Sequence, residues 1–156
     1  MQIASRFSIA VHALLFINEF QDEYRITSDF IASSVRVNPV VIRRILGQLK
    51  IAGLINVSRG SNGSTLAKQP KAITLLDVYT AVGCVEGSLF AFHEDPNPEC
   101  LVGGNIHVIL DPALESAQTA LEASLRKTKF SDLAANLDVM KPATGAKKKK
   151  TGKKLK

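Results

Sequence analysis

Apolar residues recur every three or four positions near the start of the chain, and this spacing predicts a helix from Ser5 to Phe20. The apolar face of this helix consists of Ile9, His12, Ala13, Phe16, Ile17 and Phe20. Because His12 lies on this face, we interpret it as a core residue or as a residue of a subunit contact. A second, short helix follows, for which Thr27 or Ser28 is the predicted N-cap, and it ends near Ser34.

A third helix is predicted to begin at Pro39 and to end near Ala52. Asn38 can accept a hydrogen bond from the first turn, and Pro39 suits the first helical position, where its missing N–H would have no partner. Gly53 is well placed just after the helix. The predicted buried stripe is Ile42, Ile45, Leu46 and Leu49. Two short helices joined by a turn of about three or four residues are typical of a helix-turn-helix.

The next segment predicts a β-hairpin. Residues 54–58 and 65–67 are strand candidates, and the residues between them are rich in glycine and serine. A hairpin that directly follows a helix-turn-helix has the layout of a wing. Thr74 and Asp77 then fit a capping box, which opens a helix to about Val82.

A long helical pattern follows the irregular segment 86–104. Pro112 either begins this helix, with Asp111 as its cap, or lies inside a longer one. Apolar residues at alternating spacings of four and three form a short coiled-coil-like seam, which we interpret as a dimer interface: Leu110, Leu114, Ala117, Leu121 and Leu125. A last short helix begins near Ser131.

These patterns predict a mainly α fold with a small β-hairpin wing, in which a winged helix-turn-helix precedes a long C-terminal dimerisation helix. The predicted units are a winged helix-turn-helix domain at residues 1–84, a sensor-type loop at 85–104, the dimerisation helix with a terminal short helix at 105–137, and a disordered lysine-rich tail at 138–156. No apolar run approaches the roughly 18–20 residues that a membrane span needs, and the N-terminus does not resemble a signal peptide. We therefore expect a cytoplasmic protein with no membrane partner.

The net charge of +6 comes from the end of the chain. Residues 141–156 contain eight lysines and no acidic residue, whereas the rest of the chain carries 12 basic and 14 acidic side chains. One alternative function is therefore nonspecific nucleic-acid binding driven by the lysine tail. Another is an interaction module whose helix-turn-helix does not read DNA.

The exposed face of the third helix carries residue types that read DNA. Arginine can contact guanine through two hydrogen bonds or bind phosphate, and valine can pack on a thymine methyl group. Gly47 lies on this face and leaves space for a close approach of backbone. The candidates for DNA contact on this helix and at its start are Asn38, Val40, Val41, Arg43, Arg44 and Gln48.

Two other segments complete the predicted DNA surface. Arg59 in the wing tip is a candidate for the minor groove, which attracts a guanidinium where it is narrow, and Ser61 follows two residues later as a further candidate for DNA contact. Ser5 and Arg6 can bond phosphates at the start of the first helix, where backbone N–H groups also point outward. Double-stranded DNA is therefore the expected partner.

The remaining residue types give no support for an enzyme. The three histidines are scattered, and we recognise no arrangement of nucleophile, base and acid. His93, Cys100 and His107 are metal-ligand types, but six residues separate each from the next, whereas Cys–His sites usually show short paired spacings. We therefore expect no metal and no cofactor, interpret Cys84 as structural and take Cys100 as a candidate redox sensor.

Several motifs stand in order along the chain: Ser5-Arg6-Phe7, residues 38–44, residues 52–55, Ser58-Arg59-Gly60 with Gly63, and Leu66-Ala67. Together they resemble the Rrf2 family of winged-helix repressors, which includes iron–sulfur-cluster, nitric-oxide and cysteine-metabolism regulators. The resemblance covers roughly residues 1–137, and residues 96–103 are similar to a subgroup that keeps one cysteine in this loop.

The resemblance implies a homodimer built through the long C-terminal helix and bound to an inverted repeat, with DNA contacts at Arg43, Arg44 and Arg59. We expect a repressor whose signal, a redox change or a small molecule, reaches the loop at 85–104. Relatives that bind a cluster have three closely spaced cysteines in the loop before the dimer helix. Since Cys100 stands alone there, no iron–sulfur cluster is expected in this chain.

Overall fold

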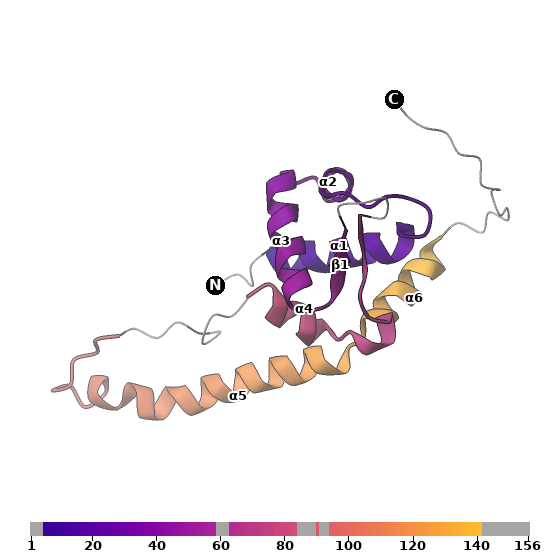
Figure 1. Ribbon diagram of the computed structural model, residues 1–156. Coiled ribbons are helices and arrows are strands. Elements are labelled where there is room, and N and C mark those ends of the chain that lie inside the picture. Colours follow the sequence, from indigo (N-terminus) through magenta and orange to yellow (C-terminus); the bar gives the residue numbers. More distant parts are fainter. Residues whose placement is uncertain (1–4, 59–62, 84–89, 91–93, 142–156) are drawn as a thin grey trace.

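The computed structural model describes residues 5–58, 63–83, 90 and 94–141. The elements are α1 (Arg6–Phe20), α2 (Ser28–Val35), α3 (Pro39–Ile51), β1 (Ile55–Val57), β2 (Ser64–Leu66), η1 (Pro70–Ala72), α4 (Leu75–Ala81), η2 (Gly103–Asn105), α5 (Ile106–Lys127) and α6 (Phe130–Met140). All of them except η2 and α5 gather in one packed body, and α5 extends away from it (Figure 1). The predicted fold, mainly helical with a small hairpin after the second helix of a helix-turn-helix, is confirmed.

Side-chain caps define the helix-turn-helix. Thr27 begins α2, because its Oγ1 accepts a hydrogen bond from the N–H of Phe30 at 3.2 Å. Asn38 begins α3 in the same way, since its Oδ1 accepts from the N–H of Val40 at 2.9 Å. Between the two helices Arg36 adopts a left-handed conformation with a φ of 58°, which ends α2 and turns the chain toward α3.

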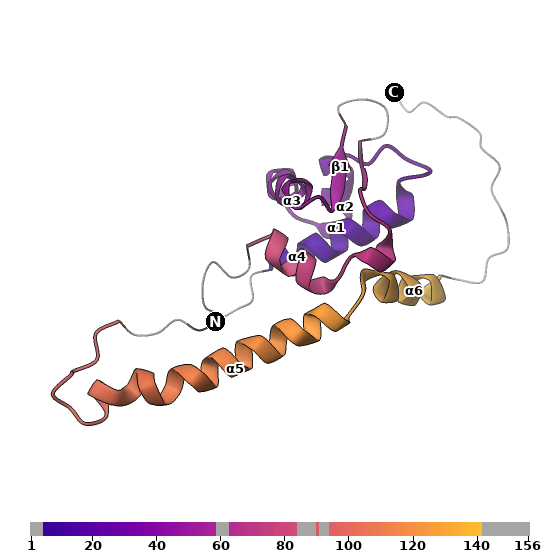
Figure 2. The same cartoon turned by 60° about the horizontal axis from the view of Figure 1, so that its bottom comes forward.

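Hydrogen bonds attach the hairpin to the body at both ends of β2. β1 and β2 pair antiparallel with Ile55 opposite Leu66. The N–H of Ser64 donates to the carbonyl oxygen of Ile26 at 2.9 Å, and the N–H of Leu66 donates to Oε1 of Gln21 at 2.9 Å. These bonds hold β2 against the segment between α1 and α2, while β1 packs on α3 (Figure 2).

The core forms around α1, which contacts α2, α3, α4, α6 and β2. The predicted stripe of α3 is confirmed, since its buried residues are Ile42, Ile45, Leu46 and Leu49. The predicted face of α1 is partly wrong, because its buried residues are Ala10, Ala13, Leu14, Phe16 and Ile17. His12 is exposed, with its Nε2 3.0 Å from Oγ of Ser34, and is not a core residue. Since elements pack on several sides of α1, their positions decide which of its residues are buried.

The long helix α5 differs from the other α-helices in its exposure to solvent. None of its 22 residues is buried. Pro112 lies inside α5, so the alternative in which Pro112 begins the helix is wrong. Asp111, the expected cap, instead has its Oδ1 3.2 Å from Nδ1 of His107, one turn earlier. None of the described helices is both long enough and apolar enough to cross a membrane.

After α5 the chain returns to the packed body. Phe130, the first residue of α6, is fully buried in the core, and its N–H donates to the carbonyl oxygen of Ile73 at 2.9 Å. Just before it, the carbonyl oxygen of Thr128 accepts from the N–H of Leu75 at 3.0 Å. The helix continues to Met140, three residues beyond the expected end of structure at residue 137. The terminal helix therefore packs on the winged helix-turn-helix rather than continuing α5.

Gly63 offers a test of how the hairpin is attached. Its φ is +68°, and a Cβ at this position would collide with the backbone of Ile26. We expect Gly63→Ala to lower the free energy of unfolding by about 2 kcal/mol or more, because the strained φ and the collision add. Gly47 on α3 is the matched control, since a Cβ there meets no described atom within 4 Å.

We expect Gly47→Ala to raise the free energy of unfolding by about 1 kcal/mol, because alanine is the better helix former. Urea unfolding followed by circular dichroism measures both variants. If both variants keep the wild-type stability, or share one stability, the close contact between Gly63 and Ile26 does not hold the hairpin.

Candidate nucleic-acid interface

The outward face of α3 presents the residues that the sequence singled out. Val40, Val41, Arg43 and Arg44 are exposed, and Gln48 is half-buried. Successive residues of an α-helix point about 100° apart, so Arg43 and Arg44 leave the helix toward different neighbours. The surface therefore has two flanks, one on each side of α3.

On the first flank, α3 lies against the start of α1. A surface pocket of about 230 Å³ is lined by Arg6, Val40, Val41, Arg44, Ile45 and Gln48. Five of the predicted DNA-contact residues are thus brought together, although Arg6 is far from the others in sequence. The Nε of Arg6 is buried and has no hydrogen-bond partner among the described residues. Ser5 precedes Arg6 as the N-cap of α1, and its side chain makes no capping hydrogen bond.

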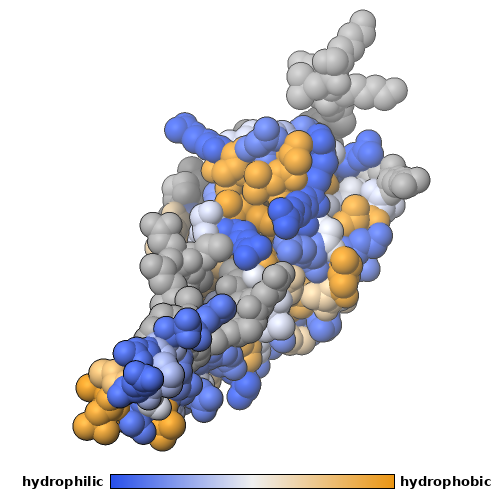
Figure 3. All heavy atoms as spheres, turned by 90° about the vertical axis from the view of Figure 1, so that its left-hand side faces the viewer, coloured by the Kyte–Doolittle hydropathy of each residue, from blue (hydrophilic) through white to orange (hydrophobic). Residues whose placement is uncertain are grey.

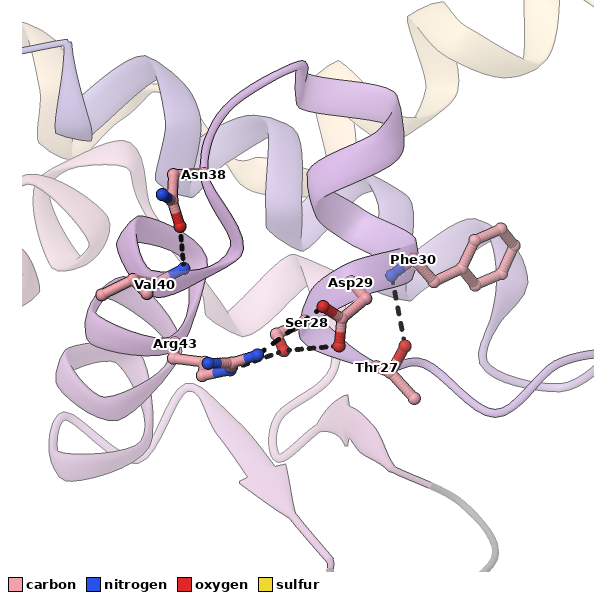
Figure 4. A network of polar contacts seen from close by, with 7 residues as sticks. All are labelled: Thr27, Ser28, Asp29, Phe30, Asn38, Val40 and Arg43. Carbon is pink, nitrogen blue, oxygen red and sulfur yellow. Dashed lines mark hydrogen bonds and ion pairs between the residues drawn. The ribbon is translucent and has the colours of Figure 1, made fainter.

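On the second flank, Arg43 reaches across to the first turn of α2 (Figure 4). Its Nε donates to Oγ of Ser28 at 3.2 Å, and its Nη2 lies 3.6 Å from Oδ1 of Asp29. The side chains of Arg43 and Asp29 are 60% and 68% exposed, so this ion pair is well hydrated and adds little to stability. Its structural effect is to orient the guanidinium.

The same flank contains cations that the sequence analysis missed. A groove of about 350 Å³ between α3 and the hairpin is lined by Arg25, Ile26, Thr27, Ser28, Arg43, Leu46, Gly47, Lys50, Val57, Ser58, Gly63 and Ser64. Lys50 could have been found from sequence, because Arg43, Gly47 and Lys50 follow the spacing of one helix face. Arg25 and Ser28 in this groove, and Asp29 beside it, could not, because only the folded structure brings them close to α3.

Asn38 has less freedom to contact DNA than its neighbours. Its Oδ1 already accepts the hydrogen bond that begins α3, so the amide NH₂ group is what remains for another partner. Arg59, Ser61, Cys84 and His93 lie outside the described residues, as do the lysines beyond Lys141. The predictions made for these residues therefore stay predictions.

The loop before α5 holds Cys100, which is exposed and free. Hydrogen bonds from the backbone of Gly103 and then of Val102 lower the pKa of this thiol, with desolvation opposing them weakly. The loop is tightly turned, since a Cβ at Gly103 would collide with the backbone of Asn97. The backbone geometry of the loop therefore lowers the pKa of Cys100 relative to that of an unperturbed cysteine.

The described residues do not fit an iron centre. Iron–sulfur clusters are usually held by about four cysteine thiolates, whereas Cys100 is the free cysteine of the described segments. His107 is engaged with Asp111, and no group of three histidine, cysteine or carboxylate side chains gathers in these segments. We derive no role for a metal from this donor set.

The predicted seam occupies one face of α5, and further apolar side chains are exposed near the start of this helix. Leu110 and Ala117 are exposed, and Leu114, Leu121 and Leu125 are half-buried. Val108 and Ile109, which the seam does not include, are 76% and 69% exposed, and Leu101 and Val102 in the preceding loop are also exposed. Figure 3 shows hydrophobic side chains gathered at the end of the molecule that α5 and the preceding loop form.

The chain is similar to known proteins over most of its length. The Rrf2 family, described as "Iron-dependent Transcriptional regulator", matches residues 3–136. "Putative HTH-type transcriptional regulator YwnA" of Bacillus subtilis (strain 168) is 43% identical over 135 residues, which are 86% of this chain and 98% of YwnA.

Solved structures show the same fold. The crystal structure of "a putative DNA binding protein" is 38% identical, with a TM-score of 0.66, and the match covers 83% of this chain and 98% of that one. The structure of CymR, "the Global Cysteine Regulator of B. subtilis", is 20% identical with a TM-score of 0.64 over 87% of this chain and 98% of CymR. At 20% identity the similarity to CymR shows a shared fold and nothing about the function of this chain.

The pKa of Cys100 predicts how this thiol reacts. Because backbone hydrogen bonds lower its pKa, we expect alkylation of Cys100 by iodoacetamide to reach half its maximal rate below the pH of an unperturbed cysteine, about 8.5. The rate is measured against pH by mass spectrometry of the Cys100 peptide. N-acetylcysteine is the reference, and an equal or higher midpoint for the protein would contradict the loop geometry.

Proposed function

Because the chain belongs to the Rrf2 family of transcriptional regulators, which are not enzymes, we propose that it binds an inverted-repeat operator as a homodimer and represses transcription there. The observation that carries this proposal is the charge on α3. Outside residues 141–156 the chain has more acidic than basic side chains, yet α3 has three cationic side chains and no acidic one. Positive charge is thus concentrated on the helix that projects its side chains outward.

The two flanks of α3 suggest a division of roles on DNA. Arg43 and Arg44 would contact guanine or phosphate in the major groove, while Val40 or Val41 would pack on a thymine methyl group. Gln48 would reach a base edge beside Arg44. Arg6, which Ser5 precedes, and Arg25 flank α3, and Lys50 lies in its last turn; there they would contact the phosphate backbones and set the register of the helix.

The apolar surface of α5 supports the dimer. Leu110, Leu114, Ala117, Leu121 and Leu125 would form its seam. An exposed apolar surface of this kind on a monomer usually marks an interaction site. A two-fold dimer would place its α3 helices about 34–36 Å apart, one DNA turn, or a multiple of this distance.

Cys100 is the proposed sensor of a redox signal. The loop that carries Cys100 leads directly into α5, so modification of this thiol would act on the geometry of the subunit contact. The lowered pKa of Cys100 supports this role, because the thiolate is the reactive form.

Selection of bound duplexes from a random DNA pool tests the proposed function and its alternative, nonspecific binding by the lysine tail. We expect the full chain and a chain ending at Lys141 to recover the same inverted repeat at about 150 mM salt, where nonspecific attraction is weak. Lys141 is retained because its Nζ bonds Glu19 and Asp138, each at 2.7 Å. Enrichment that disappears with residues 142–156 would favour the alternative, and no enrichment from either chain would contradict sequence-specific binding.

A charge placed on the seam tests the dimer. Leu110 is exposed in the single chain, so Leu110→Glu leaves the described core intact. We expect this variant to raise the dimer dissociation constant about 100-fold, because the interface would bury an unpaired carboxylate. Thr119→Glu, on the opposite face of α5, is the control and should leave association unchanged. Sedimentation equilibrium measures both, and equal effects of the two substitutions would exclude the seam as the interface.

A further inference from the structure

The surface around α3 contains a carboxylate that needs an explanation. Asp29 is 68% exposed and belongs to the flank on which Arg25, Arg43 and Lys50 gather. If DNA lies on this surface, a negative side chain there repels the phosphates and weakens binding to every sequence. Asp29 would therefore lower the overall affinity for DNA. Its contacts with neighbouring side chains indicate a different benefit for DNA recognition.

Asp29 belongs to a closed arrangement of three side chains (Figure 4). Oγ of Ser28 accepts from Nε of Arg43 at 3.2 Å and donates to Oδ2 of Asp29 at 3.4 Å. Oδ1 of Asp29 faces Nη2 of Arg43 at 3.6 Å. Ser28 and Asp29 are fixed by the first turn of α2, so a rigid element of the helix-turn-helix holds a long and otherwise mobile side chain.

The arrangement leaves one side of the guanidinium for a ligand. Arginine has five N–H groups in a planar fork. With Nε bound to Ser28 and one edge of Nη2 facing Asp29, the N–H groups of Nη1 and the other edge of Nη2 remain. These two terminal nitrogens can donate together to O6 and N7 of a guanine.

We infer that Asp29 is a specificity-determining positioning residue, which holds Arg43 in the orientation that reads a guanine. This inference rests on the proposed function. Asp29 lowers the general attraction for DNA and improves the discrimination between base pairs, because a guanidinium fixed in advance loses less freedom when it meets the correct base. Desolvation on DNA strengthens the contact between Asp29 and Arg43, which water screens in the free protein.

A structural role for Asp29 predicts a different behaviour. An acidic residue in the first turn of a helix interacts favourably with the helix dipole, and its removal would weaken α2. That loss would lower the affinity for all duplexes alike. The readout that separates the two roles is therefore the ratio of affinities for two duplexes, measured with one protein.

The experiment uses four variants of the full chain: Asp29→Asn, Arg43→Ala, the double variant and Asp95→Asn. Asp95 is an exposed carboxylate in the loop before α5, so its substitution is the matched control for the loss of one negative charge. Fluorescence anisotropy measures the affinity for the selected operator, for operators with single G·C→A·T changes, and for an unrelated duplex. Thermal unfolding of each variant checks that it folds.

We expect Asp29→Asn to reduce discrimination about 10-fold at one G·C pair in each half-site, while the affinity for the unrelated duplex stays equal or rises. Arg43→Ala should remove discrimination at the same pair, and the double variant should not reduce it further. Asp95→Asn should keep the ratio of the wild type. The thermal midpoint of Asp29→Asn should stay within about 4 °C of the wild type.

Two results would overturn the inference alone. Asp29→Asn could keep full discrimination, or it could still reduce discrimination when Arg43 is absent, which would mean that Asp29 contacts a base directly. A wild-type chain with equal affinity for all duplexes would overturn both the inference and the proposed function.

Discussion

The burial of one apolar stripe of α3 is the constraint on which the rest of the structure depends. Ile42 and Leu49 are fully buried, and Ile45 and Leu46 nearly so, against a core built around α1. With this stripe fixed, the period of about 3.6 residues leaves the side chains between its members outside. Arg44 then lies on the α1 side with Arg6, and Arg43 lies on the side of α2 and the hairpin. The same packing that stabilises the body thus distributes positive charge over both sides of one exposed helix.

The sequence predicts those features that depend on neighbours along the chain. The caps Thr27 and Asn38, the stripe of α3, the hairpin and the capping box of Thr74 with Asp77 all follow from local hydrogen bonds or a regular period. The features that it misses depend on how separate helices pack. His12 is exposed because the partners of α1 cover other residues, and Asp29 becomes a neighbour of Arg43 only through the fold. The burial of Phe130 is also missed, because no neighbouring residue indicates that the chain after α5 returns to the core around α1.

Helix α5 connects the loop that carries Cys100 with the winged helix-turn-helix. At its start, η2 and the turn around Cys100 lead into the helix, where the apolar residues are most exposed. At its end, Thr128 is bonded to the first residue of α4, and Phe130 is buried in the core of the winged helix-turn-helix. A helix whose end is bonded to the winged helix-turn-helix and whose start follows the loop of Cys100 connects these two places. Energetic coupling along such a path requires two arrangements of α5 that differ in stability.

Methylation interference shows whether the outward face of α3 reads base edges in the major groove, as we propose. Methylation of guanine N7 removes an acceptor in the major groove without changing the phosphates. We expect N7 methylation of guanines at symmetric positions in the two half-sites of the selected operator to prevent binding. If N7 methylation leaves binding unchanged at every guanine, while phosphate ethylation prevents it, the protein contacts the backbone alone and α3 does not read bases.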